Sequence, residues 1–206
     1  ELDDLGLTKN TIVVFTSDNG GIRSIAPQNP LRAGKGSYYE GGTRVPCIIR
    51  WPGIIEAGSL SDEPIINVDF FPTFKEILDI EMKGKLLDGQ SILPILVGNS
   101  LEPRPFFWHF PIYLQSYDKL NDDGRDPLFR TRPGSTVLFE GWKLHIYYED
   151  QGVELYYLPN DPGERNNIAK KEPIKVHELL EKLKTWQVKV DAPIPTELNP
   201  DYISEK

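Results

Sequence analysis

Four residues combine reactive side chains with loop positions suited to a charged ligand: Asp18, Asn19, Lys35 and His109. Asp18 and Asn19 place a carboxylate beside an amide oxygen, and two glycines follow them. Hard cations such as Ca²⁺ and Mg²⁺ bind oxygen ligands of this kind, and glycine allows the backbone to approach closely. Asn-Gly is also a common turn dipeptide, so the tetrapeptide alone favours a turn over a metal site.

Lys35 lies between two glycines in residues 32–37, RAGKGS. A lysine on such a loop can approach an anion as a point charge. The spacing differs from the phosphate-binding motif G-x-x-x-x-G-K-[ST], so the stretch is not a P-loop. Taken alone, it favours a solvated surface lysine.

His109 lies in the aromatic run FFWHFP at residues 106–111. Such a run can line a pocket for a ring-shaped substrate, either a sugar or an aryl group. A core histidine bonded to the backbone explains the pattern equally well. Glu40 and Arg44 are predicted to form an ion pair within their loop, and Cys47 to be an inert buried residue of a strand.

The elements around these residues follow the pattern of α/β proteins. Residues 10–17 and 45–51 are continuously apolar, which predicts strands buried on both faces of a parallel sheet. Asp18 then follows a strand end, where the loops of open α/β sheets carry ligands. Residues 22–44 predict a long irregular loop, and residues 69–80 a short amphipathic helix.

A different pattern begins near residue 131. Three short strands with tight connections are predicted at residues 135–139, 142–148 and 154–158. A helix from Pro173 to about residue 190 carries an apolar stripe and is expected to pack on this antiparallel meander. The chain therefore predicts two domains, residues 1–130 and residues 131–206, the second made of the meander, the helix and a tail.

Composition excludes several classes of protein. The 206 residues include 31 acidic and 23 basic side chains, a net charge of −8, which argues against nucleic acid as a partner. No apolar run is long enough to cross a bilayer, and no signal peptide is visible in this sequence. The single cysteine excludes an internal disulfide and a cysteine-based zinc cluster.

Four stretches occur in a familiar order: NTIVVFTSDNGG, LRAGKGSYYEGGTRVPCIIRWPG, VDFFPTF and ELYYLPNDPGERNNIA. Over residues 1 to about 190 the chain resembles the C-terminal part of a type I, formylglycine-dependent sulfatase of the alkaline-phosphatase-like superfamily. The resemblance implies an α/β/α sandwich followed by a small antiparallel sheet with a helix. Residues 1–130 would belong to the sulfatase core and residues 131–206 to the C-terminal subdomain.

The resemblance also implies roles for single residues. Asp18 and Asn19 match two ligands of one Ca²⁺ ion, and Lys35 matches a lysine that contacts the sulfate or its bridging oxygen. His109 falls where some relatives place a histidine that contacts substrate. The implied activity is hydrolysis of aryl or sugar sulfate esters, with a sulfated glycan as a candidate substrate.

One family feature is absent from this sequence. The formylglycine nucleophile is made from a C/S-x-P-x-R motif, which the 206 residues do not contain. We therefore expect the nucleophile and the other metal ligands in an N-terminal half of the same protein, and we expect these residues alone to be inactive. The resemblance implies a periplasmic or secreted enzyme. Two alternatives remain open: a phosphodiesterase or phosphonate hydrolase of the same superfamily, and a non-catalytic carbohydrate-binding module.

Overall fold

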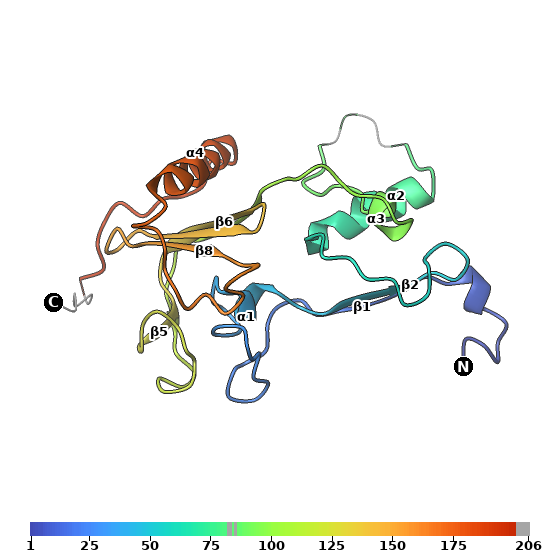
Figure 1. Ribbon diagram of the computed structural model, residues 1–206, viewed down its shortest axis with the longest axis horizontal. Helices are drawn as coiled ribbons and strands as arrows, with labels where there is room; N and C mark the ends of the chain where they lie inside the picture. The colour runs from blue at the N-terminus through green and yellow to red at the C-terminus, as the bar shows by residue number, and fades with distance from the viewer. Residues whose placement is uncertain (82–83, 85, 201–206) are drawn as a thin grey trace. The chain divides into compact units, whose positions relative to one another are not determined.

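The computed structural model describes residues 1–81, 84 and 86–200, and these form two compact units (Figure 1). Unit 1 comprises residues 1–18 and 46–102, and unit 2 comprises residues 19–45 and 103–206. The units do not follow the division expected at residue 130, because residues 19–45 pack against the later strands. Residues 201–206 of the expected tail lie outside the described residues.

Unit 1 contains a two-stranded antiparallel sheet of β1 (Val13–Thr16) and β2 (Cys47–Arg50), after the short helix η1 (Thr8–Asn10). The expected parallel pairing is therefore wrong for these two strands. Phe15 and Ile48 are each 63% exposed and Cys47 is exposed, so the expected burial is also wrong. An apolar run indicates that a strand can be buried. The strand is buried only where other elements pack on both faces of its sheet.

The predicted helix of unit 1 is confirmed as α2 (Phe70–Ile77), which follows η2 (Asn67–Asp69) and is followed by α3 (Leu93–Leu96). The Asp69 carboxylate accepts hydrogen bonds from the backbone of Ile66 at 2.9 Å and Gln90 at 3.0 Å. The Thr73 hydroxyl accepts another from Ile92 N at 3.0 Å. These bonds hold α2 and α3 together.

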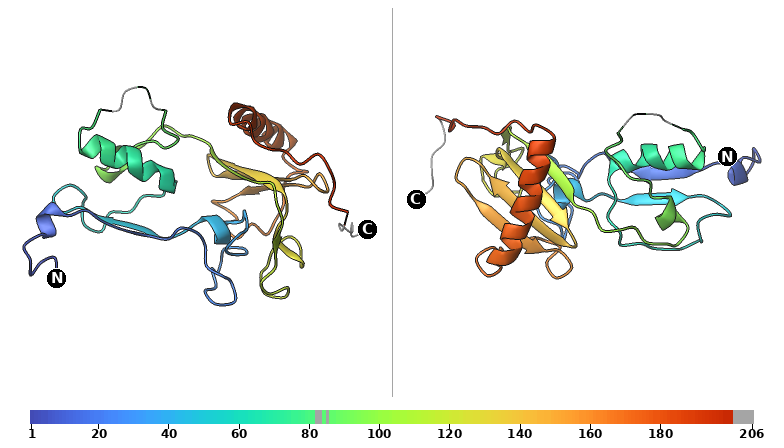
Figure 2. Two further views of the ribbon diagram at one scale, coloured as in Figure 1. Left: turned by 180° about the vertical axis from the view of Figure 1, so that it is seen from behind. Right: turned by 90° about the horizontal axis from the view of Figure 1, so that it is seen from above.

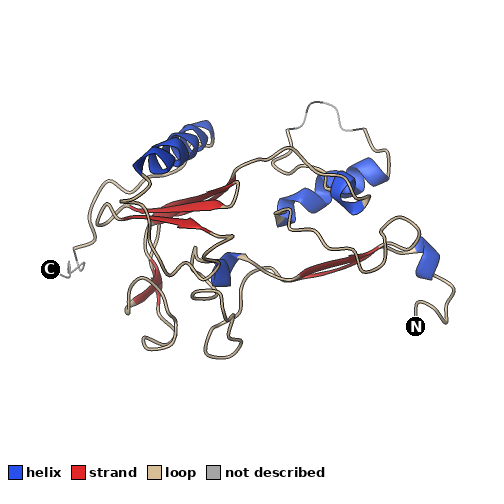
Figure 3. Ribbon diagram, viewed as in Figure 1, coloured by secondary structure: helices blue, strands red, loops and turns tan. Residues whose placement is uncertain are grey.

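Unit 2 is built on a four-stranded antiparallel sheet with strand order β3-β6-β7-β8. Its strands are among those drawn in red in Figure 3. The predicted meander is confirmed as β6 (Gly134–Phe139), β7 (Trp142–Tyr147) and β8 (Val153–Tyr157). The edge strand β3 (Phe106–Phe110) was not predicted, because its run of aromatic residues lacks an alternating pattern. Smaller elements are α1 (Glu40–Thr43) and the paired strands β4 (Leu114–Gln115) and β5 (Phe129–Thr131).

The two faces of this sheet differ in what covers them. Helix α4 (Pro173–Lys189) crosses one face, as predicted (Figure 2), and the core there consists of Val137, Leu144, Leu155, Leu179 and Leu183. Alternate residues of the strands point to the other face, where Lys143 and His145 are fully buried. The loop that carries Lys35 packs on this second face, since the ring of Tyr39 lies 5.1 Å from that of His145.

Candidate functional site

The Lys35 loop is held by backbone hydrogen bonds to two neighbouring segments. Lys35 N donates to Gly21 O at 2.9 Å, and Gly20 N donates to Gly42 O at 3.0 Å. Gly41 N in turn donates to Arg32 O at 2.9 Å. The structure thus brings the segment that follows Asn19 beside the loop that carries Lys35.

Close approach explains why glycines occur at these contacts. A Cβ atom on Gly34 would collide with the carbonyl oxygen of Gly21, and one on Gly20 would collide with that of Gly41. Both obstacles are backbone atoms, which cannot turn aside as a side chain could. The glycines therefore let three backbone segments lie in direct contact below Lys35.

Two tyrosines that follow Lys35 anchor the loop to the sheet. The Tyr38 hydroxyl lies 2.9 Å from the carbonyl oxygens of both Phe110 and Gly134. The Tyr39 hydroxyl donates to Glu154 Oε2 at 2.6 Å. Burial raises the pKa of Tyr39 well above its ordinary value, so its hydroxyl keeps the proton that it donates.

A buried ionic network lies under the end of the loop. Lys143 Nζ is 2.7 Å from Glu40 Oε1, 3.1 Å from the Thr43 hydroxyl and 3.8 Å from Glu164 Oε1. Glu40 N donates to Glu164 Oε2 at 2.5 Å, and His145 Nε2 lies 2.7 Å from Glu164 Oε1. Lys143, His145 and Glu164 are all inaccessible to solvent.

The protonation state of Glu164 follows from these neighbours. Burial by itself raises the pKa of this carboxyl, but the charge of Lys143 and the hydrogen bond from His145 outweigh burial and hold the pKa below its ordinary value. Glu164 is therefore ionised at neutral pH, and His145 Nε2 carries the proton, since a carboxylate only accepts.

The expected ion pair within the loop is present but secondary. Arg44 Nη1 lies 3.7 Å from Glu40 Oε2, and the Arg44 side chain is 58% exposed. Because Arg44 is largely exposed and the distance is long, this pair contributes little to stability. Glu40 is fixed mainly by its shorter contact with Lys143.

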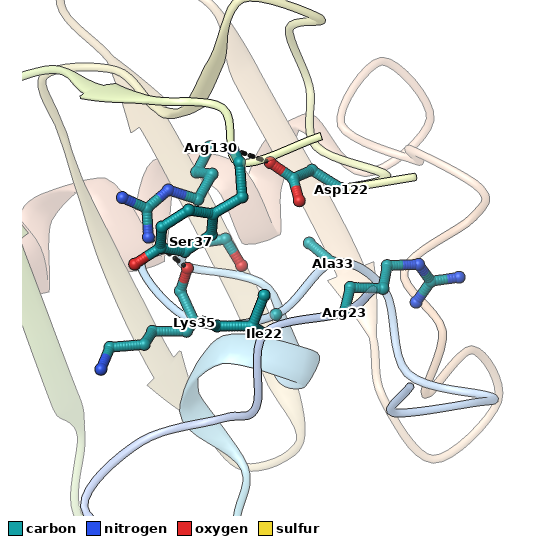
Figure 4. Close-up of a pocket in the computed structure, with 9 residues that line it drawn as sticks. Ile22, Arg23, Ala33, Lys35, Ser37, Asp122 and Arg130 are labelled. Carbon is teal, nitrogen blue, oxygen red and sulfur yellow. Dashed lines mark hydrogen bonds between the residues drawn. The ribbon is translucent and has the colours of Figure 1, made fainter. Parts of the chain in front are cut away.

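Lys35 stands out from these bonded neighbours because it is exposed, and its ammonium group extends away from the loop (Figure 4). Within the described part of the chain, no hydrogen bond or ion pair engages its Nζ atom. The backbone of Lys35 is thus fixed, while its ammonium group is accessible to a ligand. That arrangement fits the anion contact inferred from the family resemblance.

Asp18 and Asn19 follow the end of β1, as the sequence predicts for a ligand loop. Asp18 is exposed, and among the described residues no hydrogen bond or ion pair engages its carboxylate. The pair supplies hard oxygen donors of the type that Ca²⁺ takes, but a complete site needs about six to eight of them. No cluster of three His, Cys, Asp or Glu side chains suited to a metal occurs in the described ranges. Asp18 and Asn19 could therefore supply some, but not all, of the ligands of a calcium site.

His109 lies on the other face of the sheet, beside α4. Its Nδ1 atom is 2.7 Å from the Ser135 hydroxyl, and its Nε2 atom is 3.0 Å from Pro193 O. Trp186 of α4 contacts the ring at 6.4 Å between centroids. The structure does not bring His109 together with Lys35, and its contact with substrate stays a prediction.

Sequence reasoning missed the residues that support Lys35 from below. Lys143 and His145 alternate with apolar residues in WKLHIY, a pattern usually read as a solvent-facing side of a strand. Glu164 lies in the DPGERNN stretch, which carried the family resemblance without a stated role. The alternation of polar residues in this strand was the available signal, because it also suits a sheet face that is covered by a polar loop.

The fold and this loop arrangement place the chain among sulfatases of the alkaline-phosphatase-like fold. The crystal structure of Ps i-CgsB in complex with k-i-k-neocarrahexaose superposes with a TM-score of 0.74 at 26% identity, over 97% of this chain and 41% of that one. The structure of BT4656 in complex with its substrate D-glucosamine-2-N,6-O-disulfate gives 0.70 at 27% identity, over 95% and 38%.

Sequence comparison supports the same assignment. Residues 34–190 match the family described as N-sulphoglucosamine sulphohydrolase, C-terminal, and the chain belongs to this sulfatase family. A sulfatase of Formosa agariphila is 35% identical over 91% of this chain and 35% of its own length. Human arylsulfatase A is 29% identical over 91% and 39%. The chain thus spans little more than a third of the length of these relatives.

Proposed function

We propose that this chain is the C-terminal part of a sulfatase that hydrolyses aryl or sugar sulfate esters. The observation that carries the proposal is Lys35, an exposed and unengaged cation on a loop fixed by backbone bonds and a buried ionic network. An N-acetylgalactosamine-6-O-sulfatase of Bacteroides thetaiotaomicron, 30% identical over 89% of this chain, supports a sulfated sugar as the substrate.

Lys35 would act on the charge that develops during hydrolysis. Breaking the bond between sulfur and the bridging oxygen leaves negative charge on that oxygen until a proton reaches it. An ammonium group held beside this oxygen stabilises the transition state more than the ester, because the charge is larger there. Because hydrogen bonds already fix the backbone of Lys35, less conformational freedom is lost when its side chain binds the sulfate.

Asp18 and Asn19 would hold part of one Ca²⁺ site in the complete protein. When bound, the cation supplies positive charge against the sulfate oxygens. In this proposal the formylglycine nucleophile and the remaining ligands belong to an N-terminal half of the same protein. The described residues include no helix long and apolar enough to span a membrane. The proposal places the whole enzyme in the periplasm or outside the cell, as the family resemblance implies.

The test is steady-state kinetics of the complete protein with 4-nitrophenyl sulfate. Lys35→Ala should lower kcat and kcat/KM together by about 10²–10³-fold, the effect of removing one oxyanion donor. Lys35→Arg should restore activity only in part, because a planar fork replaces a compact charge. The matched control is Lys170→Ala, which removes an exposed lysine from unit 2.

Three results would contradict the proposal. A loss below about twofold in Lys35→Ala, under 1 kcal/mol, would leave Lys35 without a catalytic role. Faster hydrolysis of a 4-nitrophenyl phosphodiester than of the sulfate would favour the phosphodiesterase alternative. If the complete protein bound sulfated sugars without turning them over, the binding-module alternative would hold.

A further inference from the structure

A second cation, Arg130 of β5, lies against the Lys35 loop. Its Nη1 atom donates to Lys35 O at 3.1 Å, and its Nε atom donates to Gln115 O of β4 at 2.7 Å. A Cβ atom on Gly36 would lie 3.0 Å from Arg130 Nη1, so the absence of a side chain there makes room for the guanidinium. Arg130 is therefore bonded directly to the backbone that carries Lys35.

An exposed tyrosine fixes the plane of the guanidinium. The central carbon of the Arg130 guanidinium lies 3.6 Å from the centre of the Tyr117 ring, which is 51% exposed. The backbone of Tyr117 is itself held, because Asp122 Oδ2 accepts from Tyr117 N and from the Ser116 hydroxyl, both at 2.7 Å. The stack thus sets the direction of the remaining N–H groups of Arg130.

Unlike Arg125, Arg132 and Arg165 of unit 2, Arg130 has no acidic partner among the described residues. Arg125 pairs with Asp150 at 2.7 Å, Arg132 pairs with Asp126, and Arg165 pairs with Asp123 at 2.6 Å. Across residues 1–81, 84 and 86–200, no carboxylate oxygen lies within 4.0 Å of the Arg130 guanidinium or of Lys35 Nζ. Two neighbouring cations without a carboxylate partner, one on the Lys35 loop and one on β5, are unexpected in a chain of net charge −8.

The directions of the side chains agree with a shared ligand. Figure 4 shows Lys35 and Arg130 extending to the same side of a small hollow, while Asp122 and Arg23 lie on its other side. Two N–H groups on Nη2 of Arg130 have no acceptor among the described residues. A planar pair of donors of this kind matches the two oxygens of a carboxylate or of a sulfate.

We infer that Arg130, oriented by Tyr117, binds a second oxyanion of the substrate beside the sulfate that Lys35 contacts. The inference rests on the proposed function and makes it more specific: the preferred substrate is a sulfated sugar with a further negative group. That group is either a carboxylate of a neighbouring uronic acid or a second sulfate on the same sugar. Arg130 is thus a specificity-determining residue rather than part of the bond-breaking step.

The experiment compares three ligands with the complete protein, by turnover and by calorimetric binding. N-acetylgalactosamine 6-sulfate carries one anion, its uronosyl disaccharide adds a carboxylate, and N-acetylgalactosamine 4,6-disulfate adds a sulfate. In the wild type, one of the doubly anionic ligands should show at least about tenfold higher kcat/KM and affinity than the singly anionic one. The preferred ligand identifies the source of the second oxyanion.

The variants then assign that preference to Arg130. Arg130→Gln should abolish the preference, lowering kcat/KM for the preferred doubly anionic ligand at least about tenfold more than for 4-nitrophenyl sulfate. Arg130→Lys should retain part of the preference because the charge remains. Arg50→Gln is the matched control, since it removes an exposed arginine on β2 of unit 1.

Failure of the inference and failure of the proposed function give different results. Equal kcat/KM and affinity for all three ligands in the wild type, or a preference that survives in Arg130→Gln, would overturn the inference. Equal losses on 4-nitrophenyl sulfate and on the sugars would also overturn it, because Arg130 would then support the loop in general. No turnover of any sulfate ester by the wild type would refute the proposed function, while the binding series still tests Arg130.

Discussion

The replacement Lys143→Met tests the buried ionic network under the Lys35 loop. Methionine keeps most of the side-chain volume but removes the charge that faces Glu40 at 2.7 Å and Glu164 at 3.8 Å. The variant leaves these two carboxylates buried near each other without their shared cation. Breaking a buried ion pair by removing one partner costs about 3–5 kcal/mol.

A Coulomb estimate from these distances gives a similar free-energy cost. Two unit charges about 4 Å apart attract by about 4 kcal/mol at an effective dielectric constant of about 20. Lys143 is fully buried, so solvent screens this attraction little. We expect the free energy of unfolding at pH 7 to fall by about 4 kcal/mol, and Lys35-dependent activity to fall with it because the loop loses its anchor.

The sign of the pH dependence separates this explanation from lost packing. In the wild type the pKa of Glu164 is lowered, because Lys143 and His145 outweigh its burial. Its contribution to stability is therefore present above the unfolded pKa and is lost as the pH falls through the folded pKa. Without Lys143, burial raises the pKa of Glu164. The penalty in the variant should then be largest near neutral pH and shrink toward the ordinary pKa of about 4.5.

Urea unfolding of wild type, Lys143→Met and the exposed control Lys170→Met at several pH values measures these quantities. Adding Glu40→Gln to Lys143→Met should recover part of the lost stability, since one of the unpaired charges disappears. A loss below about 1 kcal/mol at pH 7, or a penalty that stays constant between pH 4.5 and 7, would refute the electrostatic reasoning.

Three further outcomes follow from other parts of the molecule. Leu179→Ala, at a fully buried position of α4, should destabilise the protein by about 2–5 kcal/mol in chemical denaturation, whereas Ile174→Ala, 86% exposed on the same helix, should stay within about 0.5 kcal/mol. Glu164→Gln should flatten the loss of melting temperature below about pH 4.5, because the group whose lowered pKa causes part of that loss is gone; an unchanged slope would contradict this. Asp18→Ala in the complete enzyme should lower both bound calcium, measured by elemental analysis, and activity, and retained calcium would remove Asp18 from the ligand set.

The periodic pattern of apolar residues predicted the elements that pack against their neighbours in the sequence. The meander and α4 were predictable, because alternate apolar residues in the strands and an apolar stripe from Val176 to Trp186 bury the same core. Strand β3 was missed, since an aromatic run of five residues carries no period, and only pairing with β6 makes it a strand. The parallel pairing expected for β1 and β2 was wrong, because apolar composition does not specify a strand's neighbour or its direction.

The sequence by itself determined the family, since the order of its glycine-rich and acidic stretches is specific, and through that resemblance it predicted Lys35 as a contact to the sulfate. Only the tertiary structure decided what supports that lysine. Lys143 and Glu164 are distant in sequence from Glu40, and the alternating polar residues of β7 do not specify which loop will cover them. The same holds for Arg130, which reaches the Lys35 loop across 95 residues of sequence. Such contacts depend on how the loop folds back onto the sheet, which a one-dimensional pattern does not encode.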